Sequence, residues 1–96
     1  MRVDVSARAR RDLEAIAAYI ARDDHAAAEA WITRLHEVAE LASVHPSAGR
    51  RVPEWDDRAV REVYLRTYRV IYRVEKKRIV ILRVIEGHRL LPKKRG

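Results

Sequence analysis

Apolar residues recur with a helical period in the first half of the chain. From Ala7 to about Arg22 they are spaced by three and four residues, and a second stripe of the same kind ends at Val44. Ser6 is a suitable N-cap for the first segment, and Asp23 or Asp24 for the second. The pattern therefore predicts two helices that form an antiparallel hairpin, because the loop between them is short.

Strand-like alternation starts the chain and dominates its second half. Residues 2–6 alternate between polar and apolar and predict a short first strand. Three further runs, at residues 60–66, 68–75 and 78–86, are rich in β-branched and aromatic residues and are joined by short turns. Such short links favour an antiparallel meander. We therefore expect an α+β domain of order β-α-α-β-β-β, with the helical hairpin packed on one face of an antiparallel sheet.

The same alternation assigns faces in the last strand. We expect one face to hold Val80, Leu82 and Val84, and the other to hold Ile79, Ile81 and Ile85. Arg83 interrupts the second face, so its charge needs solvent, a carboxylate or a site that uses it. The face of the sheet away from the helices is expected to be partly free, and arginines on it would form a binding surface.

Length and composition indicate one small domain. The 96 residues are expected to form a single unit, with residues 93–96 as a disordered basic tail. The chain has no cysteine, which favours a reducing compartment. Its uncharged stretches are too short to cross a bilayer. We expect a cytoplasmic protein with no membrane association.

Charge is distributed unevenly between the halves. Residues 1–45 hold 6 basic and 8 acidic residues, whereas residues 46–96 hold 15 basic and 6 acidic residues. Arginine outnumbers lysine, and its planar guanidinium suits bidentate contacts with phosphate or carboxylate. The imbalance indicates a nucleic acid, an acidic protein, or both as partners. A genome rich in GC codons explains an arginine preference equally well.

Candidate chemistry is confined to the basic half. The four histidines are scattered and the three glycines lie far apart, so we expect no metal site, no phosphate loop and no cofactor. Arginines with a histidine could cleave RNA without metal, and His88 is the best acid or base. The alternative is that His88 is an ordinary strand-end residue. Arg61 and Arg69 could instead pair with Glu62 or Glu75 on neighbouring strands.

Four segments follow one another in a recognisable order: VSARARRDLEAIAAYIA (Val5–Ala21), HPSAGRRVPE (His45–Glu54), REVYLRTYRVIYRVE (Arg61–Glu75) and IVILRVIEGHRLLP (Ile79–Pro92). In these segments the chain resembles the RelE/ParE superfamily of type II toxins. The resemblance implies the β-α-α-β-β-β fold. It also implies a cognate antitoxin, whose acidic C-terminal segment would wrap the toxin in a hetero-oligomer.

The resemblance implies two alternative targets. RelE-like members cut mRNA in the ribosome, and Arg69, Arg89 and His88 would be the catalytic residues of such a nuclease. ParE-like members bind DNA gyrase. Two lysines of the RelE pattern are replaced here by Glu62 and Tyr64, and the tyrosine expected after Gly-x-Arg is absent, which favours ParE.

Five residues are therefore candidates for contact with the target or the antitoxin: Arg61, Arg69, Arg83, His88 and Arg89. A third possibility is an inactive relative that only binds its antitoxin.

Overall fold

The computed structural model describes residues 1–89 and 91, so the predicted tail at 93–96 lies outside the described residues. Two helices follow a short first strand, as the pattern predicts: β1 (Arg2–Val5), α1 (Ala7–Ala21) and α2 (His25–Val44). The predicted caps are present as well. Ser6 Oγ accepts a hydrogen bond from the Ala9 amide at 3.0 Å, and an Asp24 carboxylate oxygen accepts one from the Ala27 amide at 3.1 Å.

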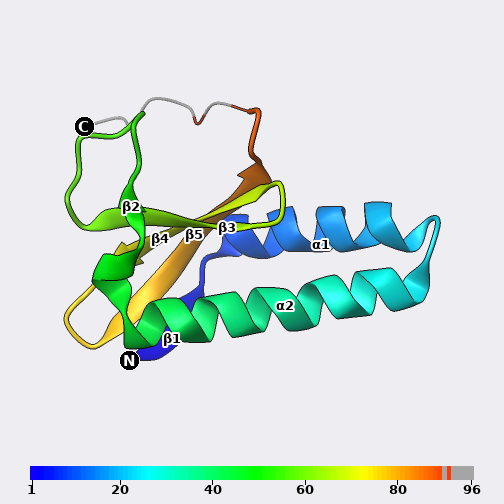
Figure 1. Ribbon diagram of the computed structural model, residues 1–96, viewed down its shortest axis with the longest axis horizontal. Coiled ribbons are helices and arrows are strands. Elements are labelled where there is room, and N and C mark those ends of the chain that lie inside the picture. The colour runs from blue at the N-terminus through cyan, green and yellow to red at the C-terminus, as the bar shows by residue number, and fades with distance from the viewer. Residues whose placement is uncertain (90, 92–96) are drawn as a thin grey trace.

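The second half forms the rest of a sheet. A 3₁₀ turn, η1 (Pro46–Ala48), leads into a short strand, β2 (Arg50–Arg51), which the sequence did not predict. The three predicted strands follow as β3 (Val60–Leu65), β4 (Tyr68–Val74) and β5 (Arg78–Glu86). The helical hairpin lies along one side of this sheet (Figure 1). None of the helices in the described part of the chain is long and apolar enough to span a bilayer.

The described residues form a sheet of five strands in the order β1-β5-β4-β3-β2. Strands β2 to β5 pair antiparallel, but β1 is parallel to β5, with Val3 opposite Ile79 and Val5 opposite Ile81. The predicted α+β class and element order are confirmed. The sheet is mixed rather than wholly antiparallel, because the long connection through the helices lets the first strand join the last in the same direction.

A β-bulge in β5 changes the predicted faces of that strand. Ile71 lies opposite Arg83 and Tyr72 lies opposite Ile81, so Leu82 has no partner across the ladder. Ile79, Ile81 and Val84 therefore pack in the core under the helices. Strict alternation predicts Val84 on the face opposite Ile79 and Ile81. This prediction is wrong, because the extra residue Leu82 shifts the alternation by one position.

A second, smaller core covers the other face of the sheet. It contains Val52, Val60, Ile71, Ile85 and Leu91. Val52 comes from the segment after β2 and Leu91 from the segment after β5, so two connecting segments close over the strands. The expectation of a partly free face is thus wrong for most of this surface. Tyr64 is the large side chain that stays exposed there, at 48%.

Tyr72 connects the main core to the turn after α2. Its side chain is fully buried and its hydroxyl donates a hydrogen bond to the Pro46 carbonyl at 2.8 Å. Tyr72→Phe leaves this carbonyl without its donor, and we expect the free energy of unfolding to fall by about 1–2 kcal/mol. Urea denaturation measures the loss. Tyr19→Phe is the control, because Tyr19 is exposed, and an equal loss in both variants would contradict the role of the Tyr72 hydroxyl.

Candidate functional site

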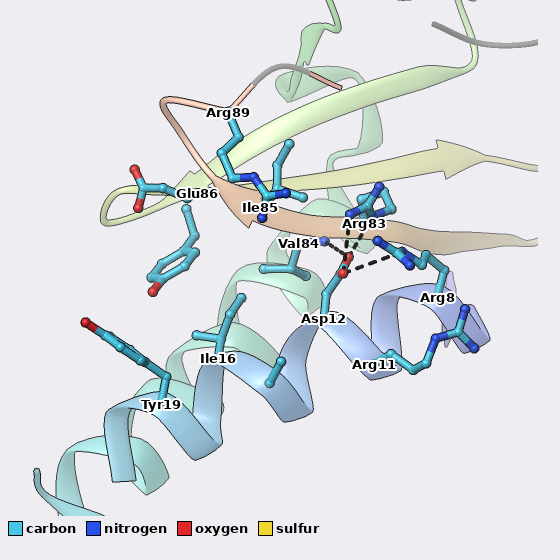
Figure 2. Close-up of a pocket in the computed structure, with 12 residues that line it drawn as sticks. Arg8, Arg11, Asp12, Ile16, Tyr19, Arg83, Val84, Ile85, Glu86 and Arg89 are labelled. Carbon is cyan, nitrogen blue, oxygen red and sulfur yellow. Dashed lines mark hydrogen bonds and ion pairs between the residues drawn. The ribbon is translucent and has the colours of Figure 1, made fainter. Parts of the chain in front are cut away.

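A groove of about 680 Å³ lies between α1 and the edge of β5 (Figure 2). Its lining is charged: it includes four arginines and two carboxylates, which are Arg8, Arg11, Arg83, Arg89, Asp12 and Glu86. The excess of arginine makes it a candidate binding site for an anionic partner.

The groove exists because β1 covers only the first part of β5. The pairing of β1 ends at Val5 opposite Ile81, and Ser6 then continues it by donating from its amide to the Ile81 carbonyl at 3.0 Å and from its hydroxyl to the Leu82 carbonyl at 3.2 Å. Asp12 of α1 accepts the next edge amide, that of Val84, at 3.0 Å. Among the described residues, no strand pairs with this edge of β5 beyond that point. The N-terminal part of α1 thus closes part of the edge, and the end of β5 is left without a paired strand among the described residues.

Asp12 also explains why an arginine interrupts β5. Its carboxylate accepts from Arg83 at 2.8 and 3.4 Å and lies 3.7 Å from Arg8 (Figure 2). The Arg83 side chain is only 15% exposed, so the pair is largely shielded from water. The sequence left three possibilities for the charge of Arg83: solvent, a carboxylate or a functional site. The structure shows that it pairs with a carboxylate. The pair fixes α1 against β5.

Two arginines of the groove keep their charge uncompensated. Arg11 and Arg89 are exposed, and neither makes an ion pair with any residue in 1–89 or with residue 91. Arg89 follows β5 in the turn after Glu86, while Arg11 lies in the second turn of α1 (Figure 2). Both residues line the groove, so an anion bound there would meet one cation from α1 and one from the turn after β5.

Arg69 occupies a different site, on the face of the sheet opposite the helices. It is only 3% exposed and is held by two carboxylates. Its Nε donates to Glu62 at 2.5 Å, and its two terminal nitrogens donate to the Glu54 oxygens at 2.6 and 2.8 Å. Arg50 reaches the other oxygen of Glu62 at 2.7 Å. Four side chains thus form one ion-paired group, the Arg69 cluster: Arg50, Glu54, Glu62 and Arg69.

The cluster also binds the backbone of the segment that follows β5. Glu54 accepts from the Leu91 amide at 3.1 Å, and Arg69 donates to the Arg89 carbonyl at 3.3 Å. The hydrogen bonds from Arg69 lower the pKa of Glu54 to about 2, against the desolvation that would raise it. The same contacts raise the pKa of Arg69, first through Glu54 and then through Glu62. Both partners therefore stay charged at neutral pH.

The five residues predicted to contact a target or an antitoxin do not converge on one surface. Arg61 points to the face of β3 that also carries Val63 and Leu65, where it donates to the Gly49 carbonyl at 2.9 Å. His88 is exposed in the turn after β5, 3.7 Å from Glu86. Arg83 and Arg89 line the groove, whereas the Arg69 side chain is enclosed in its cluster. These arginines do not share one face of the sheet, because strand alternation and the bulge place their side chains on different sides.

Three residues that matter at these sites were not singled out from the sequence. Asp12 and Arg11 are ordinary polar positions of an amphipathic helix until β5 is placed beside them. Glu54 lies in a turn-rich segment without a regular period, so the sequence does not predict which residue it pairs with. The pairing of Arg69 with Glu62, by contrast, was one of the alternatives drawn from the sequence, and it is confirmed.

The geometry defines a small α+β domain with a helical hairpin on a mixed sheet, of the RelE/ParE-like type. A family model described as ParE toxin of type II toxin-antitoxin system, parDE, matches residues 3–91, and the chain belongs to this family. Among solved structures, a chain described as the chromosomal ParDE TA system from P. aeruginosa has the same fold. It is 23% identical with a TM-score of 0.71, and the match covers 90% of this chain and 95% of that one. A comparison with curated proteins finds no significant match.

Replacing Arg69 tests the role of its cluster. Arg69→Met leaves Glu54 and Glu62 with little compensation in a site that excludes water. We expect the free energy of unfolding to fall by about 3–5 kcal/mol, as when one partner of a buried ion pair is removed. Chemical denaturation at neutral pH measures it.

Arg73→Met is the matched control on the same strand. Arg73 is one-third exposed and lies 3.3 Å from Asp57, so its loss should cost less than about 1 kcal/mol. Equal costs for the two substitutions would show that Arg69 has no special weight.

Proposed function

We propose that this ParE-family toxin acts in the cytoplasm, inhibits growth by binding DNA gyrase, and is neutralised by a cognate antitoxin. The observation that supports this most is the state of Arg69. In a nuclease of the RelE pattern this arginine would stabilise a phosphorane, which needs a guanidinium free to meet new negative charge. Here Glu54 and Glu62 already take the hydrogen bonds of its Nε and of both its terminal nitrogens.

The residues around Arg69 support the same preference. Glu62, which stands where the RelE pattern has a lysine, has a fully buried side chain that is held by two arginines. Its carboxylate would repel a phosphate at this position. Tyr64 stands in place of the second lysine and has no cationic group to offer a phosphate. A gyrase-binding toxin needs no such phosphate site of its own.

An acidic antitoxin segment suits the groove between α1 and β5. Arg89 is available there without an ion pair to any described residue, and Arg83 lies beside it, already paired with Asp12. The end of β5 offers an edge on which an extended segment could add as a further strand. Arg61 and His88 remain candidates for contact with the target, since neither of them lines this groove. The toxin and its antitoxin would form a hetero-oligomer.

Two assays run in parallel test the target. Purified toxin is incubated with gyrase and supercoiled plasmid, and separately with ribosomes and a defined mRNA. We expect gyrase-dependent DNA breaks or loss of supercoiling, suppressed by the antitoxin, while the mRNA stays intact. The reason is that Glu54 and Glu62 already take the hydrogen bonds of Arg69, which a RelE-like nuclease would use to stabilise the phosphorane.

Three variants and a growth experiment complete this test. Arg89→Ala should weaken antitoxin capture more than Arg51→Ala, which removes the same charge outside the groove. Codon-positioned mRNA cuts that disappear in His88→Ala would overturn the gyrase proposal in favour of a ribosome-dependent endonuclease. Unimpaired growth during expression without antitoxin would contradict any toxic activity.

A further inference from the structure

One face of α1 carries a stripe of basic and aromatic side chains. Arg8, Arg11, Ala15, Tyr19 and Arg22 follow one another at intervals of three and four residues, which places them on one side of the helix. The first four of them line the groove. Three of the five are cations, and Ala15 is small enough to let a ligand approach the helix closely.

Tyr19 gives this stripe a flat, accessible surface. It is 65% exposed, although aromatic side chains usually contribute their area to a core. The guanidinium of Arg22 lies 6.0 Å from the centre of its ring, which adds a cation to that surface. At this end of the groove the Tyr19 side chain extends away from the helix (Figure 2). Tyr19 does not belong to either core cluster of the described residues.

The cations that line the groove are available to a ligand. Asp12 is already occupied by Arg83 and the Val84 amide, so it does little to neutralise the rest. Arg11 and Arg89 have no ion pair with any residue that the structure describes, and Arg8 has only a 3.7 Å contact with Asp12. A ligand that fits must therefore present several negative charges and a flat group.

We propose that the groove of the free toxin binds a single strand of nucleic acid. Phosphates would contact Arg11 and Arg89, and a base would stack on Tyr19. A duplex fits less well because its base faces are hidden within the stack. An acidic peptide would use the arginines but would leave Tyr19 without a partner. This inference does not depend on gyrase as the target, and an antitoxin segment on the edge of β5 would exclude the strand from the groove.

Fluorescence anisotropy with labelled oligonucleotides tests the proposal on the purified chain. The probes are a dT12 strand, an rU12 strand, a duplex of the same length and a polyglutamate peptide. We expect a single strand to bind most tightly. Comparison of dT12 with rU12 shows whether the groove prefers single-stranded DNA or RNA. Affinity should fall as salt rises, with a log–log slope of about −0.7 for each phosphate contact.

Three variants separate stacking from charge. Tyr19→Ala should weaken strand binding by about ten-fold and leave the salt slope unchanged, since it removes a stacked base but no charge. Arg11→Ala should reduce the slope by about 0.7. Arg10→Ala removes the same charge from a neighbouring exposed position that does not line the groove, and it should have little effect on either quantity.

Several outcomes would overturn the proposal. Equal losses in Arg10→Ala and Arg11→Ala would mean that only net charge matters. Unchanged strand binding in Tyr19→Ala would show that no base stacks on Tyr19. Polyglutamate or duplex binding as tightly as the single strand would show that the groove does not select it. Antitoxin capture is measured separately, so failure here leaves the proposed neutralisation intact.

Discussion

A guanidinium buried in the middle of a sheet has to be neutralised, and in this protein much else depends on how that is done. Arg69 is on β4, the central strand, where water cannot reach its charge. Desolvating an ion costs several kcal/mol, so a buried arginine persists only with well-placed acceptors. Glu62 from the next strand and Glu54 from the segment before β3 supply them. Both carboxylates therefore have to arrive at one point for the domain to be stable.

This requirement organises the segments that cover the sheet. Glu54 can reach Arg69 only if the chain after β2 folds back over the strands, which also brings Val52 into the second core. The Leu91 amide and the Arg89 carbonyl then bind to Glu54 and Arg69, so the segment after β5 is held at the same place. The cluster thus joins the segment between β2 and β3, the central strand and the segment after β5. The charges of the cluster are paired with one another, whereas in the groove at α1 Arg11 and Arg89 have no ion pair with any described residue.

The sequence predicted the local elements well. Helical and strand periods are dictated by burial on one face, so the two helices, their caps and the three long strands follow from spacing alone. The parallel pairing of β1 does not, because nothing in residues 2–5 distinguishes a partner at 78–81 from one elsewhere. The bulge at Leu82 is equally hidden, since an extra residue in an apolar run leaves the composition unchanged.

The site was predicted less well for the same physical reason. Arginines recur along the basic half. The sequence predicts the face of the sheet on which each of them lies only if every strand alternates without interruption. The partner of Arg83 is 71 positions away in the chain, and that of Arg69 in the linker is 15 positions away. Pairing at such separations is decided by tertiary packing. The sequence did show that Glu62 stands where the RelE pattern has a lysine. The structure explains this glutamate, because its carboxylate pairs with Arg69.

The central claim is that Arg69 is locked by carboxylates in solution, and the ionisation of Glu54 tests it most directly. Its pKa of about 2 lies below the ordinary value of 4.5, so the ion pair stabilises the fold above about pH 4.5 and loses that contribution as the pH falls towards 2. Carbon-13 NMR of the side-chain carboxyl can follow this titration. The account predicts a midpoint near pH 2, or acid unfolding before protonation is complete. A midpoint near 4.5 in the folded protein would contradict it, because Glu54 would then not be bound to Arg69.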